Sequence, residues 1–238
     1  LPAIEGPLLV DGTSQNGGYV ALAGSGDAGV SGLVAEGQGV ELQGLVLNGF
    51  GGAGVVLAGD GGHTVSDSFV GLSSAGEPGV GNTEGGVLVR SLGNTIRDNE
   101  LAGNGSGEAV PEPEPGFKPE TVEAALGDLT ANVVIEEGAG ATISGNKIGG
   151  AMGILAVGAV DTTVTGNELM ATVGVVAGAT NPTGIGVIIN DNTFGSADDG
   201  GEADGIGVGV IGGGVQISGN TFVRKAVPVL GAAVPQGS

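Results

Sequence analysis

The chain has 238 residues, of which 54 are glycine, 10 are proline and none is cysteine. The lack of cysteine excludes disulfides and thiol chemistry. The formal net charge of −20, from 6 Lys+Arg against 26 Asp+Glu, argues against nucleic acid and anionic membrane surfaces as partners. No apolar run of 18 residues is present, so we expect no membrane insertion. The sequence does not determine the oligomeric state.

Residues 1–31 predict an irregular first coil of a repeat protein. Two short strands, at 8–10 and 19–23, are separated by the turn signal Asp11-Gly12. Terminal repeats are usually atypical because they must close the core.

Residues 141–178 contain one motif twice. The segment Thr142–Ile148 (TISGNKI) returns as Thr163–Leu169 (TVTGNEL), with 21 residues from Asn146 to Asn167. A fixed period of roughly 20–50 residues indicates a solenoid, and roughly 21 residues is too short for paired helices. Each repeat is therefore predicted to be a coil of short β-strands separated by glycine.

Related positions extend this motif over most of the chain. The asparagine-type positions are Leu45, Ser68, Asn99, Asn146, Asn167, Asn192 and Asn220. They predict a single all-β domain over residues 1–238, a parallel β-helix of about seven coils.

Equivalent side chains of successive coils should stack, because parallel strands lie ~4.8 Å apart. We expect each asparagine to adopt the left-handed conformation at a tight bend and to hydrogen-bond the asparagines of the neighbouring coils. This structural ladder would contain Asn99, Asn146, Asn167, Asn192 and Asn220. The apolar residues three before and two after each asparagine are predicted to point inward.

Two insertions interrupt the period. Residues 72–84 form a glycine-rich loop, and the second inserted loop covers residues 104–131. Within the second, residues 110–116 form an extended Pro/acid segment, and residues 119–127 predict one short helix. Long loops of a solenoid usually lie on one face, often the binding face.

Three segments carry a resemblance: Ile4–Gln15 (IEGPLLVDGTSQ), Phe69–Leu72 (FVGL) and Gly81–Val89 (GNTEGGVLV). With the asparagine repeats, they resemble bacterial secreted and cell-surface proteins of the pectate lyase-like β-helix superfamily. The resemblance implies a right-handed parallel β-helix and a secreted or cell-surface location. It implies no single activity, because such proteins include lyases, hydrolases, epimerases and modules without known catalysis, so function must be argued from a site.

The strongest catalytic candidates are Asp67, Asp98 and Arg97, with His63 nearby in the sequence. Both aspartates precede an asparagine-type position, so they should stack on adjacent coils about 5 Å apart, close to the separation in a retaining glycosidase. The competing interpretation is that aspartate is simply favoured at such turns, as Asp191 suggests.

One loop concentrates four acids: Asp198, Asp199, Glu202 and Asp204. Their oxygens would suffice for a calcium ion if the loop folded around it. A solvated acidic loop is the other interpretation. We expect no other cofactor.

Two functions from different classes remain. The first is a non-catalytic structural or display module that presents its loops to a polysaccharide or a surface protein. The alternative is a polysaccharide lyase or glycoside hydrolase acting near Asp67 and Asp98. The chain has no Trp and one Tyr, Tyr19, which leaves little aromatic surface for stacking sugars and favours the non-catalytic module.

Overall fold

The computed structural model describes residues 1–105, 130–136, 140–178, 185–195 and 204–232. All regular structure in these residues is β-strand, arranged as three sheets of eight strands each. No helix in the described part is long and apolar enough to cross a membrane. The predicted helix at 119–127 and the Pro-rich segment at 110–116 lie outside the described residues.

The first sheet contains, in order along the molecule, β1 (Leu9–Asp11), β4 (Glu41–Gln43), β7 (Thr64–Ser66), β10 (Thr95–Arg97), β13 (Thr142–Ser144), β16 (Thr162–Thr165), β19 (Val187–Asn190) and β22 (Val215–Ser218). The second sheet contains β2 (Val20–Ala23), β5 (Leu45–Asn48), β8 (Phe69–Val70), β11 (Glu100–Leu101), β14 (Lys147–Ile148), β17 (Glu168–Leu169), β20 (Thr193–Phe194) and β23 (Thr221–Phe222). The third sheet contains β3 (Leu33–Ala35), β6 (Ala53–Leu57), β9 (Gly85–Val89), β12 (Val133–Ile135), β15 (Met152–Val157), β18 (Val173–Gly178), β21 (Asp204–Ile211) and β24 (Lys225–Ala232).

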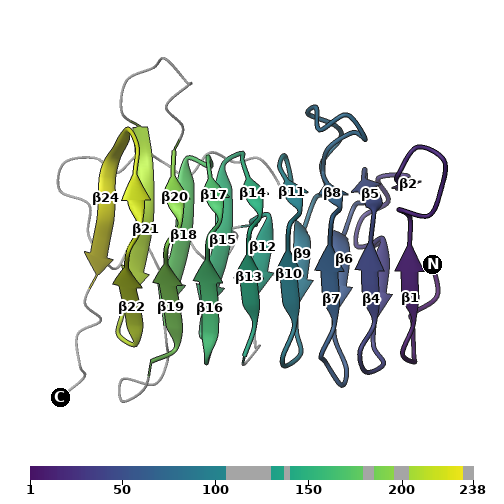
Figure 1. Ribbon diagram of the computed structural model, residues 1–238, viewed down its shortest axis with the longest axis horizontal. Coiled ribbons are helices and arrows are strands. Elements are labelled where there is room, and N and C mark those ends of the chain that lie inside the picture. The colour runs from purple at the N-terminus through teal and green to yellow at the C-terminus, as the bar shows by residue number, and fades with distance from the viewer. Residues whose placement is uncertain (106–129, 137–139, 179–184, 196–203, 233–238) are drawn as a thin grey trace.

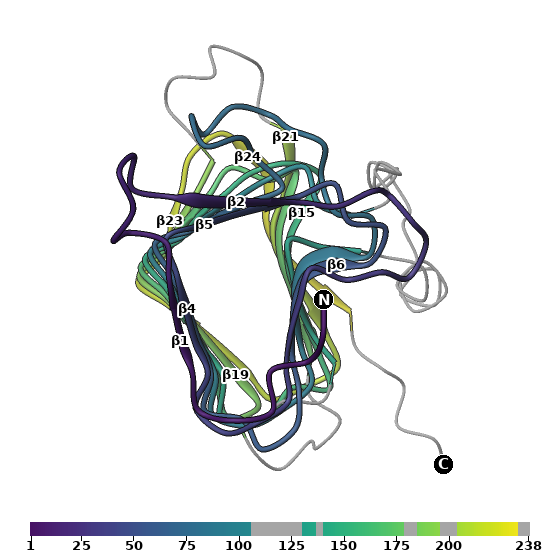
Figure 2. The same cartoon turned by 90° about the vertical axis from the view of Figure 1, so that its right-hand side faces the viewer.

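The chain visits the three sheets in turn, and neighbouring strands of every sheet are parallel (Figure 1). This is the coil arrangement that the repeat predicted. Viewed from the N-terminal end, the path β4–β5–β6 runs clockwise as the chain recedes, the right-handed sense (Figure 2). Each sheet has eight strands, one more than the about seven coils expected, because β1 and β2 form a first coil that has no asparagine-type residue.

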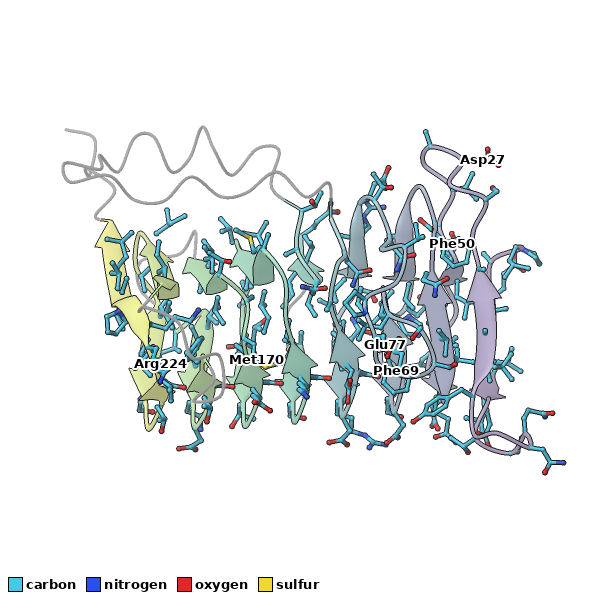
Figure 3. The ribbon with its side chains drawn as sticks, turned by 90° about the horizontal axis from the view of Figure 1, so that it is seen from above. Asp27, Phe50, Phe69, Glu77, Met170 and Arg224 are labelled. Carbon is cyan, nitrogen blue, oxygen red and sulfur yellow. The ribbon has the colours of Figure 1, made fainter. Side chains whose placement is uncertain are left out.

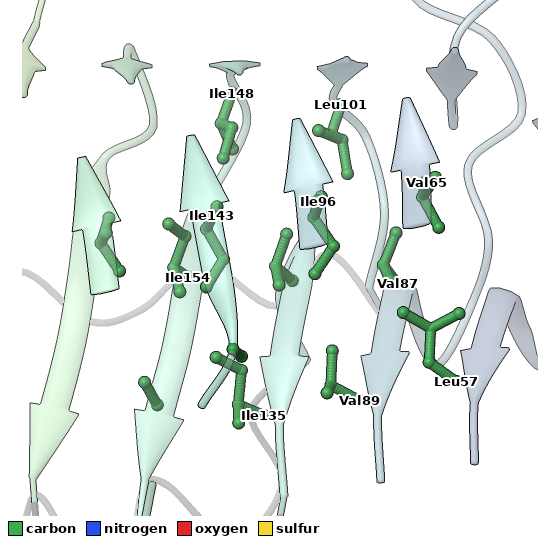
Figure 4. Packing of buried hydrophobic residues seen from close by; sticks show 14 of the residues in the cluster. Leu57, Val65, Val87, Val89, Ile96, Leu101, Ile135, Ile143, Ile148 and Ile154 are labelled. Carbon is green, nitrogen blue, oxygen red and sulfur yellow. The ribbon is translucent and has the colours of Figure 1, made fainter. Parts of the chain in front are cut away.

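The core is a set of apolar columns along the axis (Figure 4). In the first sheet, Ile96, Ile143, Val164 and Ile189 are fully buried and in register, as predicted. The second sheet contributes the predicted inward residues Leu101, Ile148, Leu169 and Phe194. Period-two alternation in short strands explains this, since every second side chain points inward.

The third sheet is apolar on both faces. Val87 and Ile154 point into the core, while the residues that follow them, Leu88 and Leu155, belong to separate buried clusters on the outer face. Strands buried on both faces read as continuous apolar runs. This explains the Gly-Val-Val-Leu type of segment that accompanies the asparagine motif.

Candidate functional site

Asp67 and Asp98 lie at the turn that leads from the first sheet to the second. Their backbones have φ of 50° and 57°, the left-handed region that glycine, asparagine and aspartate tolerate best. β7 and β10, which precede them, are adjacent and parallel. The structure therefore brings the two aspartates to equivalent places on neighbouring coils.

Arg97 lies between the two carboxylates. Its Nη1 donates to Oδ2 of Asp98 at 2.9 Å and lies 4.0 Å from Oδ2 of Asp67. The side chains of Arg97, Asp67 and Asp98 are 44%, 51% and 52% exposed. Exposed ion pairs of this kind contribute about 0–1 kcal/mol to stability. The group is solvated and carries one net negative charge.

The same turn in other coils explains why aspartate occurs there. The equivalent residues Gly44, Gly145, Gly166 and Gly219 have φ between 64° and 66°, and Asp191 has φ of 55°. The Asp98 carboxylate reaches over Gly145 of the next coil, where an added Cβ would meet Asp98 Oδ1 at 2.5 Å. Turn geometry is thus sufficient to account for an aspartate at these positions.

An insertion and an aromatic pair lie beside this turn. The rings of Tyr19 and Phe69 meet edge to face, with centroids 4.9 Å apart. The loop of residues 72–84 also packs on Phe69. Its Gly76 lies against the Phe69 ring and the Glu100 carboxylate. Phe69 and Glu77 of this loop are labelled in Figure 3. Phe69 is therefore half-buried under the loop, and Tyr19 is the more exposed ring, at 38%.

His63 does not join the aspartates. It is 1% exposed and lies just before β7, whereas Asp67 lies just after it. The His63 Nδ1 accepts a hydrogen bond from the Val40 backbone N–H at 3.2 Å, so Nε2 is the protonated nitrogen that donates to the Ala58 carbonyl at 2.8 Å. This neutral ring links two coils and is not available to a ligand.

The structure places the five ladder asparagines in one chain of hydrogen bonds. The Oδ1 of Asn146 accepts from both the backbone N–H and the side-chain amide of Asn99, each at 3.0 Å. The same double contact joins Asn146 to Asn167, Asn167 to Asn192, and Asn192 to Asn220. Ser68, one coil before Asn99, uses its backbone N–H alone.

One detail of the ladder differs from expectation. None of the described non-glycine residues with positive φ is an asparagine. The left-handed residue is the preceding glycine or aspartate, which makes the bend. The asparagine then keeps an ordinary backbone and turns its side chain inward, where Asn99, Asn146, Asn167 and Asn192 are at most 2% exposed.

Two further polar columns were missed from the sequence. At the turn from the second to the third sheet, Asn82 donates to Asn104, and Asn104 donates to Asn132. At the turn from the third sheet to the first, the backbone N–H of His63 donates to Asn94 Oδ1 at 3.0 Å. A signal was present, because Asn82, Asn94 and Asn104 all follow a glycine, as Asn146 does.

The predicted calcium ligands are only partly described. Asp198, Asp199 and Glu202 lie outside the described residues, and Asp204 begins β21. Among the residues with described placement, no group of three His, Cys, Asp or Glu side chains could hold a metal ion.

Two other charged groups stabilise turns. Arg90 pairs with Glu136 through two hydrogen bonds, 2.6 and 3.3 Å, and this contact raises the pKa of Arg90. The pKa of Asp11 is lowered, chiefly because the Thr13 hydroxyl donates to its carboxylate at 2.6 Å. Both carboxylates serve local structure.

The fold and this site define a class, a solenoid of three parallel β-sheets, and not an activity. No protein-family model matches the chain, and no curated protein matches its sequence. A solved structure, the alginate lyase from Paenibacillus sp. str. FPU-7, is similar with a TM-score of 0.51 and 14% identity, covering 96% of this chain and 87% of that one. At this identity the likeness shows the fold alone, a parallel β-helix-like solenoid.

Proposed function

We propose that this chain is a non-catalytic structural module of a secreted or cell-surface protein, which displays its inserted loops to a polysaccharide or protein partner. The proposal rests on the structural role of Asp67 and Asp98. Both occupy left-handed turn positions that glycine fills in other coils, and both face Arg97 in solvent. The backbone geometry of the turn is therefore sufficient to explain why aspartate occurs at the two positions that a catalytic function would require.

The interior supports the same proposal. Apolar columns and polar ladders run from coil to coil, so each coil is held by main-chain, amide and core contacts at once. Eight coils at ~4.8 Å spacing make a rod on the order of 35 Å long. A rod held in this way keeps its loops at a set distance from the ends, which suits a stalk or display module.

The alternative is a polysaccharide lyase or glycoside hydrolase at Asp67, Asp98 and Arg97. Two observations favour it. The fold is similar to that of an alginate lyase. The 72–84 loop contacts Phe69 and Glu100, each two residues after one of the aspartates, and Tyr19 contacts Phe69. One carboxylate would serve as acid and the other as base or nucleophile.

Turnover assays separate the two functions. Purified protein incubated with pectin, alginate, glycosaminoglycan and neutral glycans should release neither unsaturated products, followed by ultraviolet absorbance, nor reducing ends. Retained binding of one glycan in affinity electrophoresis, without turnover, would support a display module.

The variants Asp67→Asn and Asp98→Asn complete the test, with Asp191→Asn as the matched control at the same turn of a distant coil. Turnover that disappears in the first two variants and persists in the control would overturn the non-catalytic proposal and establish the enzyme.

A further inference from the structure

Three asparagines in the chain are followed directly by glycine: Asn16, Asn48 and Asn104. Such a pair is chemically reactive, because the main-chain nitrogen of the glycine can attack the carbonyl carbon of the asparagine side chain. Glycine permits this attack best, since it has no Cβ beside that nitrogen and its backbone rotates freely. The reaction also requires that the side-chain amide and the next N–H are not held in hydrogen bonds. The three pairs differ in this respect.

The Asn48-Gly49 pair is held on both sides of the bond that would react. Asn48 ends β5, and its Nδ2 donates to the Leu72 carbonyl at 2.9 Å. Gly49 donates its N–H to the Val80 carbonyl at 2.7 Å. Attack would break both hydrogen bonds, and the strand pairing of Asn48 opposes rotation of its backbone. This pair is therefore protected in the folded chain.

The Asn104-Gly105 pair is held more firmly still. The side chain of Asn104 is buried, at 8% exposed, and its Nδ2 donates to the Val70 carbonyl and to Asn132 Oδ1, both at 2.8 Å. The Gly105 N–H donates to the Asn82 carbonyl at 2.8 Å. The atoms that would react are thus fixed within the polar column at the turn from the second sheet to the third.

The Asn16-Gly17 pair lies in an open turn between β1 and β2, in the connection that projects outward from the coils in Figure 2. The turn is closed by a hydrogen bond from the Gly18 N–H to the Gln15 carbonyl at 3.0 Å, which spans the pair without using its reacting atoms. Both Asn16 and Gly17 are exposed. Within the part of the chain that the structure describes, neither the Asn16 side chain nor the Gly17 N–H has a hydrogen-bond partner. An added Cβ on Gly17 or Gly18 would have no neighbour within 4 Å, so the turn has room to move.

We propose that Asn16 is a site of spontaneous deamidation, and that among the three Asn-Gly pairs it alone reacts in the folded chain. The Gly17 nitrogen forms a bond to Cγ of Asn16, the Cγ–Nδ2 bond breaks, and ammonia leaves with the proton of the Gly17 N–H. Water then opens the resulting succinimide ring by adding its hydroxyl group to one of the two ring carbonyl carbons and a proton to the nitrogen. Breaking the bond from nitrogen to Cγ gives an aspartyl residue at position 16. Breaking the bond from nitrogen to the main-chain carbon gives an isoaspartyl residue, in which the chain runs through Cγ.

Either product adds one negative charge to the turn, and the isoaspartyl form also adds one carbon to the backbone. The fold should tolerate both, because Gly17 and Gly18 have open space around them and the turn is exposed. Changes at such surface positions have little effect on stability. The modification therefore accumulates with the age of the folded molecule and does not unfold it.

The test is peptide mapping of the folded chain after incubation at neutral and mildly alkaline pH. Cleavage after glutamate at acidic pH places the three asparagines in separate peptides, residues 6–36, 42–77 and 101–108. Mass spectrometry detects the exchange of the amide for a carboxyl group, and electron-transfer fragmentation separates aspartyl from isoaspartyl products. The peptide with Asn16 should convert. The peptides with Asn48 and Asn104 should convert more slowly by roughly tenfold or more, because local opening must precede the reaction there.

The same incubation in urea is the control for the role of the fold. The three pairs should then react at similar rates, because the hydrogen bonds that protect two of them are lost. Equal rates in the folded chain would overturn the proposal. An Asn16 peptide that stays unmodified in the folded chain, whether or not it reacts in urea, would overturn it too.

The variant Asn16→Gln is the matched control, since glutamine would need a larger ring to react. On anion exchange the parent chain should acquire more acidic species with time, while Asn16→Gln should remain a single species. Thermal midpoints of the aged parent and of the variant should agree. Acidic species that form equally fast in both chains would place the modification elsewhere and refute the assignment to Asn16.

Discussion

The residue before each ladder asparagine sets the backbone conformation at the corner between the first and second sheets. At this position the chain needs a positive φ, which glycine and aspartate both supply. The asparagine that follows is free to point inward and to satisfy the backbone of the preceding coil: Nδ2 of Asn167 donates to the Ile143 carbonyl at 2.9 Å. Each corner is therefore formed by two consecutive residues, a left-handed glycine or aspartate and the inward-pointing ladder residue after it. Asp67 and Asp98 are the left-handed residues of two such corners.

Replacing one ladder amide should destabilise the fold. Asn167→Ala removes the acceptor of the buried Asn146 backbone N–H, at 2.9 Å. It also removes one acceptor of the Asn146 side-chain amide, which keeps the Ile96 and Ser144 carbonyls. A buried polar group left without a partner costs about 1–3 kcal/mol. We expect a loss of that size in the free energy of unfolding, measured by urea denaturation followed by circular dichroism.

Thr163→Ala is the control for this substitution, because Thr163 lies in the same coil on the outer face of β16. Its effect should stay within about 0.5 kcal/mol. Equal losses in the two variants would show that the ladder amide carries no special share of the stability.

At the scale of elements, the third sheet makes room for the second through glycine. Gly153, Gly174 and Gly207 lie one residue before inward-pointing residues of β15, β18 and β21. A Cβ on Gly174 would lie 2.5 Å from the Phe194 ring and 2.6 Å from the Gly207 carbonyl oxygen. The three coils before it have the smaller Leu101, Ile148 and Leu169 at this place. The ring of Phe194 is thus accommodated by a missing side chain, and it stacks on Phe222 with centroids 5.0 Å apart.

Filling this space should be costly. Gly174→Ala forces a methyl group against a ring and a carbonyl oxygen, and overpacking of this kind typically costs about 1–3 kcal/mol. The expected result is a lower thermal midpoint. Gly213→Ala, where an added Cβ has no neighbour within 4 Å, should leave the midpoint unchanged. A harmless Gly174→Ala would mean that β18 and β20 shift apart easily and that the glycine is not needed for packing.

At the scale of the molecule, the net charge of −20 acts on the whole rod. Like charges repel within one compact chain, so NaCl and MgCl2 should raise the thermal midpoint by screening. A calcium ion held by Asp198, Asp199, Glu202 and Asp204 would add a specific term of RT ln(1 + [Ca²⁺]/Kd). The prediction is a further rise with CaCl2 over MgCl2 at equal ionic strength.

Scanning calorimetry and isothermal titration test this prediction, with Asp198→Asn/Asp199→Asn as the variant that should abolish the calcium-specific part. Identical midpoints in the two salts, and no saturable heat of binding, would leave only screening and would rule out a calcium site in this loop.

By itself, the sequence determined the coil and the side of each strand that faces inward. These follow from local patterns: alternation places Ile143 and Ile148 inside, and the repeated Gly-Asn marks the corner. Local patterns act over a few residues, so insertions elsewhere do not disturb them. The same patterns predict which residues form the asparagine ladder.

Only the tertiary structure decided which distant residues meet. The steps between consecutive ladder asparagines range from 21 to 47 residues, so strand pairing alone sets the register across the insertions. That pairing brings Arg97 to Asp67 and places His63 in the interior, away from both aspartates. It also gives the left-handed backbone to Asp98 and not to Asn99, because φ at a corner depends on how the two flanking strands are held by their neighbours.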